Sequence, residues 1–228
     1  MEKTSESKNV VKLDGVIQAC SLSQHEDGYL VGMWVRIHEK DAEGKDMAMD
    51  YPVTVHGVGK EMEDYFRRAD ELTRGEGSIE EYMDKCSVSV VGRPVMHGRD
   101  MIISASADNV RLRDRNTPQR AGIRLSGEVD SVSKRDRMAT VSVSMDGGAM
   151  QVSYLRDEGA AWKAVTDGRV RKDDTVVVEG WLQNHLLNSD NGRISRFTVV
   201  GRKFEDISLT RRLTEERKAA RNVGPKVK

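Results

Sequence analysis

The stretch that decides the fold is Arg171-Lys172-Asp173-Asp174-Thr175-Val176-Val177-Val178-Glu179-Gly180-Trp181-Leu182-Gln183. A charged turn leads into a run of β-branched residues, which is typical of a strand. Side chains alternate between the two faces of a strand, so Val176, Val178 and Leu182 share one face. Trp181 lies on the opposite face, where it is either covered by another element or exposed as a platform. The pattern therefore predicts a strand with a buried apolar face and an outward tryptophan.

An earlier segment repeats this strand. Residues 88–92 and residues 176–180 both follow the pattern Val-x-Val-x-Gly, so Arg93 takes the place of Trp181. Repetition of a pattern along a chain is the mark of duplicated structural units. The sequence therefore predicts two tandem domains.

Each copy contains five strand-like segments with a helical segment between the third and the fourth. Residues 123–129 mirror residues 11–17 at the first strand. Apolar residues recur at helical spacing within residues 60–84, and residues 158–170 form a short helix and turn in the second copy. This is the element order of the OB-fold, a small five-stranded barrel. We therefore expect a mainly β protein made of two tandem five-stranded OB-fold barrels, each with a short helix between strands 3 and 4, followed by a basic C-terminal tail.

These patterns divide the chain into five parts. The expected parts are a flexible N-terminus (1–9), an acidic first OB-fold domain (10–112, with a helical insertion at about 60–84), a basic linker (113–121), a basic second OB-fold domain (122–205) and a basic tail (206–228) that is partly helical or disordered.

A net charge of zero hides an asymmetry between the two halves of the chain. Residues 1–110 hold 13 Lys and Arg against 21 Asp and Glu, a balance of −8, and residues 111–228 hold 24 against 16, a balance of +8. Residues 202–228 alone hold 9 against 4, a balance of +5. Positive charge attracts phosphate, so we expect the second domain and the tail to meet nucleic acid and the first domain to meet a protein partner. The simpler interpretation is that the uneven surface charge only affects the solubility of the protein.

Several function classes find no support in the sequence. No stretch approaches the roughly 20 apolar residues that span a membrane, and the first residues lack the apolar core of a signal peptide. Cys20 and Cys86 stand 66 positions apart, which is neither a metal motif nor a disulfide framework and fits a reducing cytoplasm. The five histidines show no metal-binding spacing, and no nucleophile or phosphate-loop motif occurs. We therefore expect no enzyme activity, no catalytic residues, no metal and no cofactor.

Single-strand nucleic-acid binding has better support. Such binders combine a basic groove for phosphates with aromatic faces on which bases stack. The candidate residues are Trp34, Arg36 and Arg93 in the first copy, and Lys134, Arg135, Arg137, Tyr154, Trp181, Arg193 and Arg196 in the second. Trp34 and Trp181 fall opposite the apolar faces of their strands, which favours a binding or interface role. Tyr154 fits the barrel interior equally well.

Two short motifs resemble those of bacterial-type single-stranded DNA-binding proteins. Residues 171–183 are similar to that family's pattern Lys-Lys-Gly-Asp-x-Val-x-Val-Glu-Gly-x-Leu-x, and residues 104–110, Ser-Ala-Ser-Ala-Asp-Asn-Val, look like its closing strand. The resemblance covers about residues 10–112 and 122–205. The tryptophan that the family carries on its third strand is replaced by His56 in the first copy.

The resemblance implies non-catalytic binding of single-stranded DNA or RNA, in replication, recombination or repair. Two OB-folds per chain imply a homodimer if four are to assemble, as in that family. The alternative is an OB-fold assembly module in which the exposed aromatics form a subunit interface with another protein chain.

Overall fold

The structure is a computed structural model that describes residues 9–25, 28–40, 45–98, 100–156, 159–189 and 192–222, without the side chains of residues 186–194 and 219–222. Strands dominate this part of the chain, as the sequence predicted. In chain order the elements are β1 (Val10–His25), β2 (Gly28–Lys40), β3 (Asp46–Val58), α1 (Lys60–Thr73), α2 (Ile79–Lys85), β4 (Ser87–His97), β5 (Asp100–Ser106), a 3₁₀ turn (Ala107–Asn109), β6 (Val110–Leu112), β7 (Arg120–Arg135), β8 (Met138–Met145), β9 (Gly148–Leu155), α3 (Ala160–Thr166), β10 (Thr175–Ser189), β11 (Gly192–Asp206) and α4 (Ile207–Asn222).

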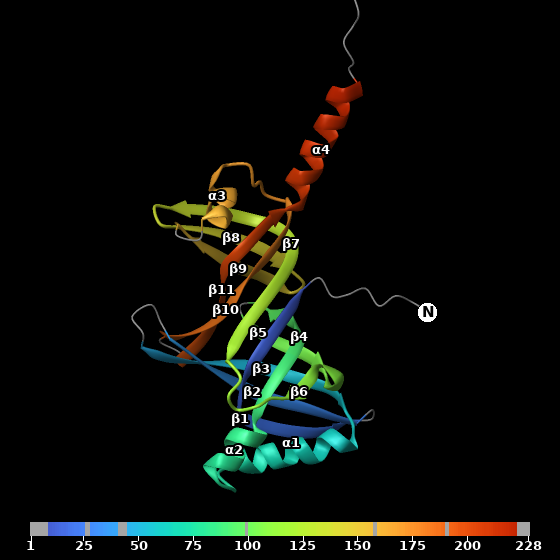
Figure 1. The fold of residues 1–228 in the computed structure, drawn as a ribbon, viewed down its shortest axis with the longest axis vertical. Helices are drawn as coiled ribbons and strands as arrows, with labels where there is room; N and C mark the ends of the chain where they lie inside the picture. Colours follow the sequence, from blue (N-terminus) through green and yellow to red (C-terminus); the bar gives the residue numbers. More distant parts are fainter. Residues whose placement is uncertain are drawn as a thin grey trace, which may run out of the picture.

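The first strands close into a five-stranded barrel, which we call barrel 1. β1 pairs with β2, β2 with β3, β3 in parallel with β5, and β5 with β4, which returns to β1. Every second residue of β2, from Val31 to Ile37, points into a fully buried core because alternation gives one inward face. α1 and α2 cover one end of barrel 1 (Figure 1).

The later strands repeat the same order, and we call them barrel 2. β7 pairs with β8, β8 with β9, β9 in parallel with β11, and β11 with β10, which pairs back to β7. This repetition is consistent with the tandem OB-folds expected from the sequence. α4 leaves the end of barrel 2 and points away from it (Figure 1).

One strand pair joins the two barrels into a single eleven-stranded sheet. The first residues of β1 pair antiparallel with the first residues of β7, from Val10 opposite Arg124 to Asp14 opposite Arg120. We call this pair the seam. Across the seam the outer faces of β5, β4, β1, β7, β10 and β11 form one continuous surface, because each of these strands pairs with the next.

A buried carboxylate fixes the linker at the seam. Asp14 is only 2% exposed, and Arg120 Nε donates to its Oδ2 at 2.9 Å while Arg113 Nη1 lies 3.7 Å from its Oδ1. Burial alone would raise the pKa of Asp14, but hydrogen bonds from Ser89 and Arg120 and the charge of Arg113 outweigh it and lower that pKa. Both ends of the linker are therefore attached to β1.

A second contact between the barrels is a packed core. Tyr51 is fully buried, and its hydroxyl donates to the Leu182 carbonyl at 2.7 Å. Asn184 Nδ2 donates to the Asp50 carbonyl at 2.6 Å, and the ring of Phe197 lies 6.4 Å from that of Tyr51. Because these groups are buried and hydrogen-bonded across the junction, the two barrels are held together by packed side chains as well as by the linker.

The structure corrects two expected element boundaries. The closing strand expected to include residues 104–110 ends at Ser106, and Ala107–Asn109 forms a 3₁₀ turn. Asn109 Nδ2 donates to Ser106 Oγ at 3.0 Å across that turn, after which β6 pairs with β4. β7 begins at Arg120, inside the expected linker.

We expect Asp14→Asn to lower the free energy of unfolding by about 1–3 kcal/mol, because it leaves two guanidinium partners without their carboxylate. Urea unfolding measures this loss, with the exposed Asp100→Asn as the matched control. The folded pKa of Asp14 is below the unfolded value of about 4, so its contribution is complete above that pH and is lost as pH falls through the folded pKa. A variant as stable as wild type at neutral pH contradicts this role.

Candidate nucleic-acid interface

OB-folds bind oligonucleotides on the face of their second and third strands and on the loops between strands 1 and 2 and between strands 4 and 5. In barrel 1 this face carries Trp34, which is 44% exposed on the outer side of β2 beside Pro52 of β3. The outward position predicted for Trp34 is confirmed. A flat, exposed aromatic ring on this face is able to stack on a base.

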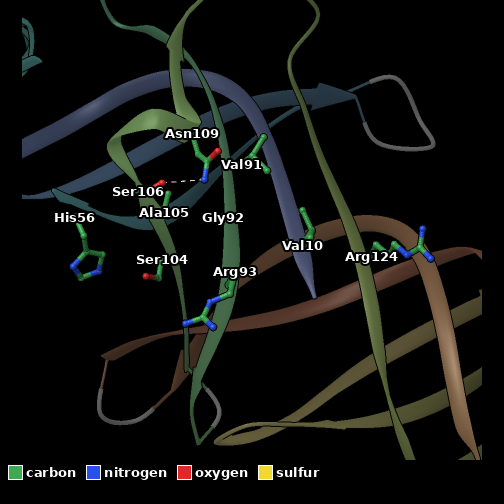
Figure 2. Close-up of a pocket in the computed structure, with 10 residues that line it drawn as sticks. All are labelled: Val10, His56, Val91, Gly92, Arg93, Ser104, Ala105, Ser106, Asn109 and Arg124. Carbon is green, nitrogen blue, oxygen red and sulfur yellow. Dashed lines mark hydrogen bonds between the residues drawn. The ribbon is translucent and has the colours of Figure 1, made fainter. Parts of the chain in front are cut away.

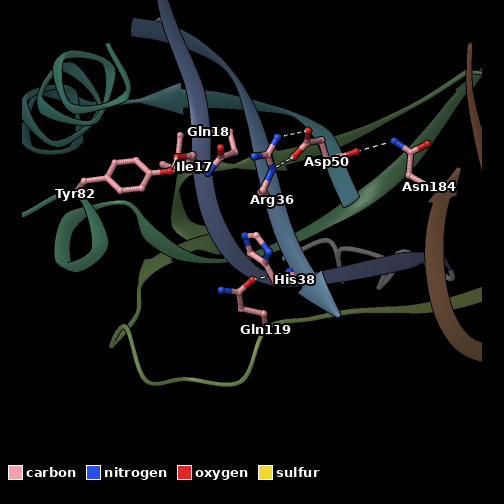
Figure 3. A network of polar contacts seen from close by, with 8 residues as sticks. All are labelled: Ile17, Gln18, Arg36, His38, Asp50, Tyr82, Gln119 and Asn184. Atoms are coloured by element: carbon pink, nitrogen blue, oxygen red, sulfur yellow. Dashed lines mark hydrogen bonds and ion pairs between the residues drawn. The ribbon is translucent and has the colours of Figure 1, made fainter. Parts of the chain in front are cut away.

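Arg36 lies on the same face, but its guanidinium already holds a carboxylate. Nε and Nη2 donate to the two oxygens of Asp50, each at 2.8 Å (Figure 3). This pair of hydrogen bonds is the main reason that the pKa of Arg36 is raised. A phosphate would have to compete with Asp50 for Arg36. The sequence suggested Arg36 as a nucleic-acid contact, but its guanidinium is already paired in the structure.

Barrel 2 presents its positive charge on a loop. Lys134, Arg135 and Arg137 are exposed at the hairpin between β7 and β8, where the sequence placed them. Lys134 Nζ donates to the Thr166 carbonyl at 2.9 Å, and this contact ties the hairpin to the end of α3. The hairpin corresponds to the loop between the first two strands of an OB-fold.

The other two arginines predicted for barrel 2 lie on β11. Arg196 is exposed and its Nη2 donates to Gln151 Oε1 at 2.7 Å, on the outer face of β9. Arg193 also belongs to β11, but its side chain lies outside the described part of the chain.

Tyr154 does not lie on the binding face. It is fully buried, its hydroxyl donates to the Lys203 carbonyl at 3.2 Å, and its ring packs edge-on against Phe204 at 5.7 Å. Gly201 makes room for it, since a Cβ at that glycine would stand 2.3 Å from the tyrosine ring. Burial raises the pKa of Tyr154 above its usual range. The expectation that Tyr154 offers a stacking surface is therefore wrong.

Trp181 and Arg93 lie on another surface, the outer face of the seam. Trp181 is 37% exposed opposite Gly122 of β7, and the guanidinium of Arg202 lies 5.9 Å from its ring centre. Trp181 lines a hollow of about 550 Å³, which adjoins a second hollow of about 950 Å³ beside Arg93, since Val10 and Arg124 line both. The outward position of Trp181 is confirmed, on a face different from that of Trp34.

Glu179 is the acidic residue at this surface, and two cations hold it. Lys203 Nζ donates to its Oε2 at 2.7 Å, and Arg124 Nη1 lies 3.5 Å from its Oε1. The hydrogen bond from Lys203 is the main cause that lowers the pKa of Glu179. Neither Arg124 nor Lys203 was expected from the sequence at this surface, although Arg124 stands between two buried residues of β7. The strand pairings that bring these two cations to Glu179 are not visible in the sequence.

Within the described ranges, no group of three or more His, Cys, Asp or Glu side chains is placed to hold a metal ion. Among the same residues, no helix is long and apolar enough to cross a membrane.

No protein-family model matches the chain, and no curated protein matches its sequence. Two solved structures align with 87% of it, both of the single-stranded DNA-binding protein from Thermus aquaticus. A deletion mutant has a TM-score of 0.56 at 13% identity with 93% of its chain covered, and the wild type has 0.54 at 14% with 92% covered. At identities this low, the alignment shows a shared fold and nothing more. The resemblance in fold that the sequence indicated is therefore confirmed.

Because Tyr154 is buried, we expect it to resist nitration by tetranitromethane in the folded protein and to react after unfolding in urea. Mass spectrometry of the digested chain locates the modified tyrosines, and the partly exposed Tyr29 is the internal control. Nitration of Tyr154 under native conditions as fast as that of Tyr29 contradicts its placement in the core.

Proposed function

We propose that the chain binds single-stranded DNA without catalysis, by base stacking and phosphate contacts on its barrels, in replication, recombination or repair. The observation that carries this proposal is Trp34, exposed on the strand face that OB-folds use for oligonucleotides. Similarity in fold to a single-stranded DNA-binding protein from Thermus aquaticus supports the same conclusion. RNA is the other ligand that such a surface accepts, because every base offers a face for stacking.

Phosphate contacts are assigned to barrel 2. The hairpin that carries Lys134, Arg135 and Arg137 supplies three exposed cations, and Arg193 and Arg196 come from β11. Barrel 1 supplies stacking through Trp34, although its half of the chain has a charge balance of −8. We divide the chain into two domains at the linker, which ends where β7 begins at Arg120. Two buried free cysteines fit a reducing compartment, and we place the protein in the cytoplasm.

Trp181 favours a second function, assembly with another copy of this chain. It stands on the broad seam surface with apolar neighbours such as Val10 and Ile123. Exposed tryptophans of this kind are common anchors in protein interfaces. A homodimer formed through this surface would bring four barrels together.

We expect Trp34→Ala to weaken binding of a labelled poly-dT oligonucleotide about tenfold, since one base loses its stacking partner. Fluorescence anisotropy measures the affinity. Trp162→Phe is the matched control, because Trp162 is only partly exposed on α3 and lies 5.9 Å from the guanidinium of Arg156. Unchanged affinity in Trp34→Ala would remove the stacking role of this residue.

Trp181→Ala separates the two functions. If Trp181 anchors a subunit interface, light scattering shows the mass of wild type falling to that of one chain in the variant, while oligonucleotide affinity per chain at low salt changes little. If mass is unchanged and the affinity falls, the tryptophan contacts DNA and the assembly proposal is wrong.

A further inference from the structure

The larger hollow, about 950 Å³, has a lining suited to an anion. Its polar groups are two guanidiniums, two hydroxyls, one amide and one imidazole, and none of the described residues that line it is acidic. These polar groups belong to Arg93, Arg124, Ser104, Ser106, Asn109 and His56 (Figure 2). This chemistry fits a phosphodiester, which accepts hydrogen bonds and carries one negative charge.

The two arginines reach this hollow from different barrels. Arg93 is exposed on β4 of barrel 1 and has no ion-pair partner among the described residues. Arg124 comes from β7 of barrel 2 and lies 3.5 Å from Glu179, whose other oxygen is held more closely by Lys203. Arg93 is therefore available to a phosphate, and Arg124 has only its long 3.5 Å contact with Glu179 to give up, whereas Arg36 makes two hydrogen bonds of 2.8 Å with Asp50.

The hollow connects with the stacking face of barrel 1. On adjacent strands, Thr54 of β3 stands beside Ser104 of β5, and Ser104 stands opposite Arg93 of β4. Thr54 is in turn opposite Gly32, which shares the outer face of β2 with Trp34. A row of small and hydroxyl side chains thus leads from the tryptophan to the hollow without a bulky residue between them.

We propose that this hollow holds the backbone of single-stranded DNA where the strand passes from barrel 1 to barrel 2, with one phosphate on Arg93 and a neighbouring phosphate on Arg124. The inference rests on the proposed function, and it adds a site that spans the seam. Ser104 and Ser106 donate further hydrogen bonds to the phosphate oxygens. Asn109 keeps Ser106 in place through its 3.0 Å hydrogen bond. His56 also lines this hollow.

The test uses the full chain and a poly-dT oligonucleotide over a series of salt concentrations. Each phosphate contact on a single strand contributes about 0.7 to the slope of log affinity against log salt, so Arg93→Gln and Arg124→Gln should each lower the slope by about 0.7. Each should also weaken binding about tenfold at low salt. The double variant should lose about the product of the two effects, because the two arginines hold different phosphates.

Two controls make the result specific. Arg74→Gln removes one exposed charge from the end of α1, away from the seam, and should bind with the wild-type slope. Arg93→Lys keeps the charge and should keep most of the slope. If wild type binds and the Arg93 and Arg124 variants behave like Arg74→Gln, the phosphate site is wrong and the proposed function stands. If wild type fails to bind at low salt, both are overturned.

Discussion

The pairing of β1 with β7 is the constraint on which the rest of this structure depends. The same residues of β1 that pair with β7 also close barrel 1 through β4, and the same residues of β7 help to close barrel 2 through β10. The barrels therefore share one hydrogen-bonded sheet, and the buried Asp14 attaches the linker to it. Because the sheet is continuous, side chains from both barrels meet on one outer surface, as Arg93 and Arg124 do.

The two barrels share an element order and differ in their outer faces. Barrel 1 exposes Trp34 and ties its nearby arginine to Asp50, whereas barrel 2 exposes a hairpin of three cations and keeps Tyr154 in its core. Inward positions must be apolar to fill a barrel, so they keep the fold in both copies. Outward positions are free of that demand, so the two barrels carry different exposed side chains there.

Strand alternation was enough to predict the fold and the outward tryptophans. Alternation along β9 also indicated that Tyr154 is buried, because Tyr154 lies on the same face of the strand as Val152 and both side chains are buried. Other features depend on contacts distant in sequence. The ion pair that occupies Arg36 joins neighbouring strands, and the hollow between Arg93 and Arg124 exists only because β1 and β7 pair. A single sequence does not show how strands of different barrels pair. The hollow that Arg93 and Arg124 line could therefore not be predicted from it.

The most direct test of the central claim is a titration of the intact wild-type chain with poly-dT at low and at moderate salt, following the emission of its three tryptophans. Binding by stacking and phosphate contacts predicts quenching that saturates and that needs more oligonucleotide as salt rises. Absence of both quenching and binding at low salt would contradict single-strand binding and leave a protein-assembly module.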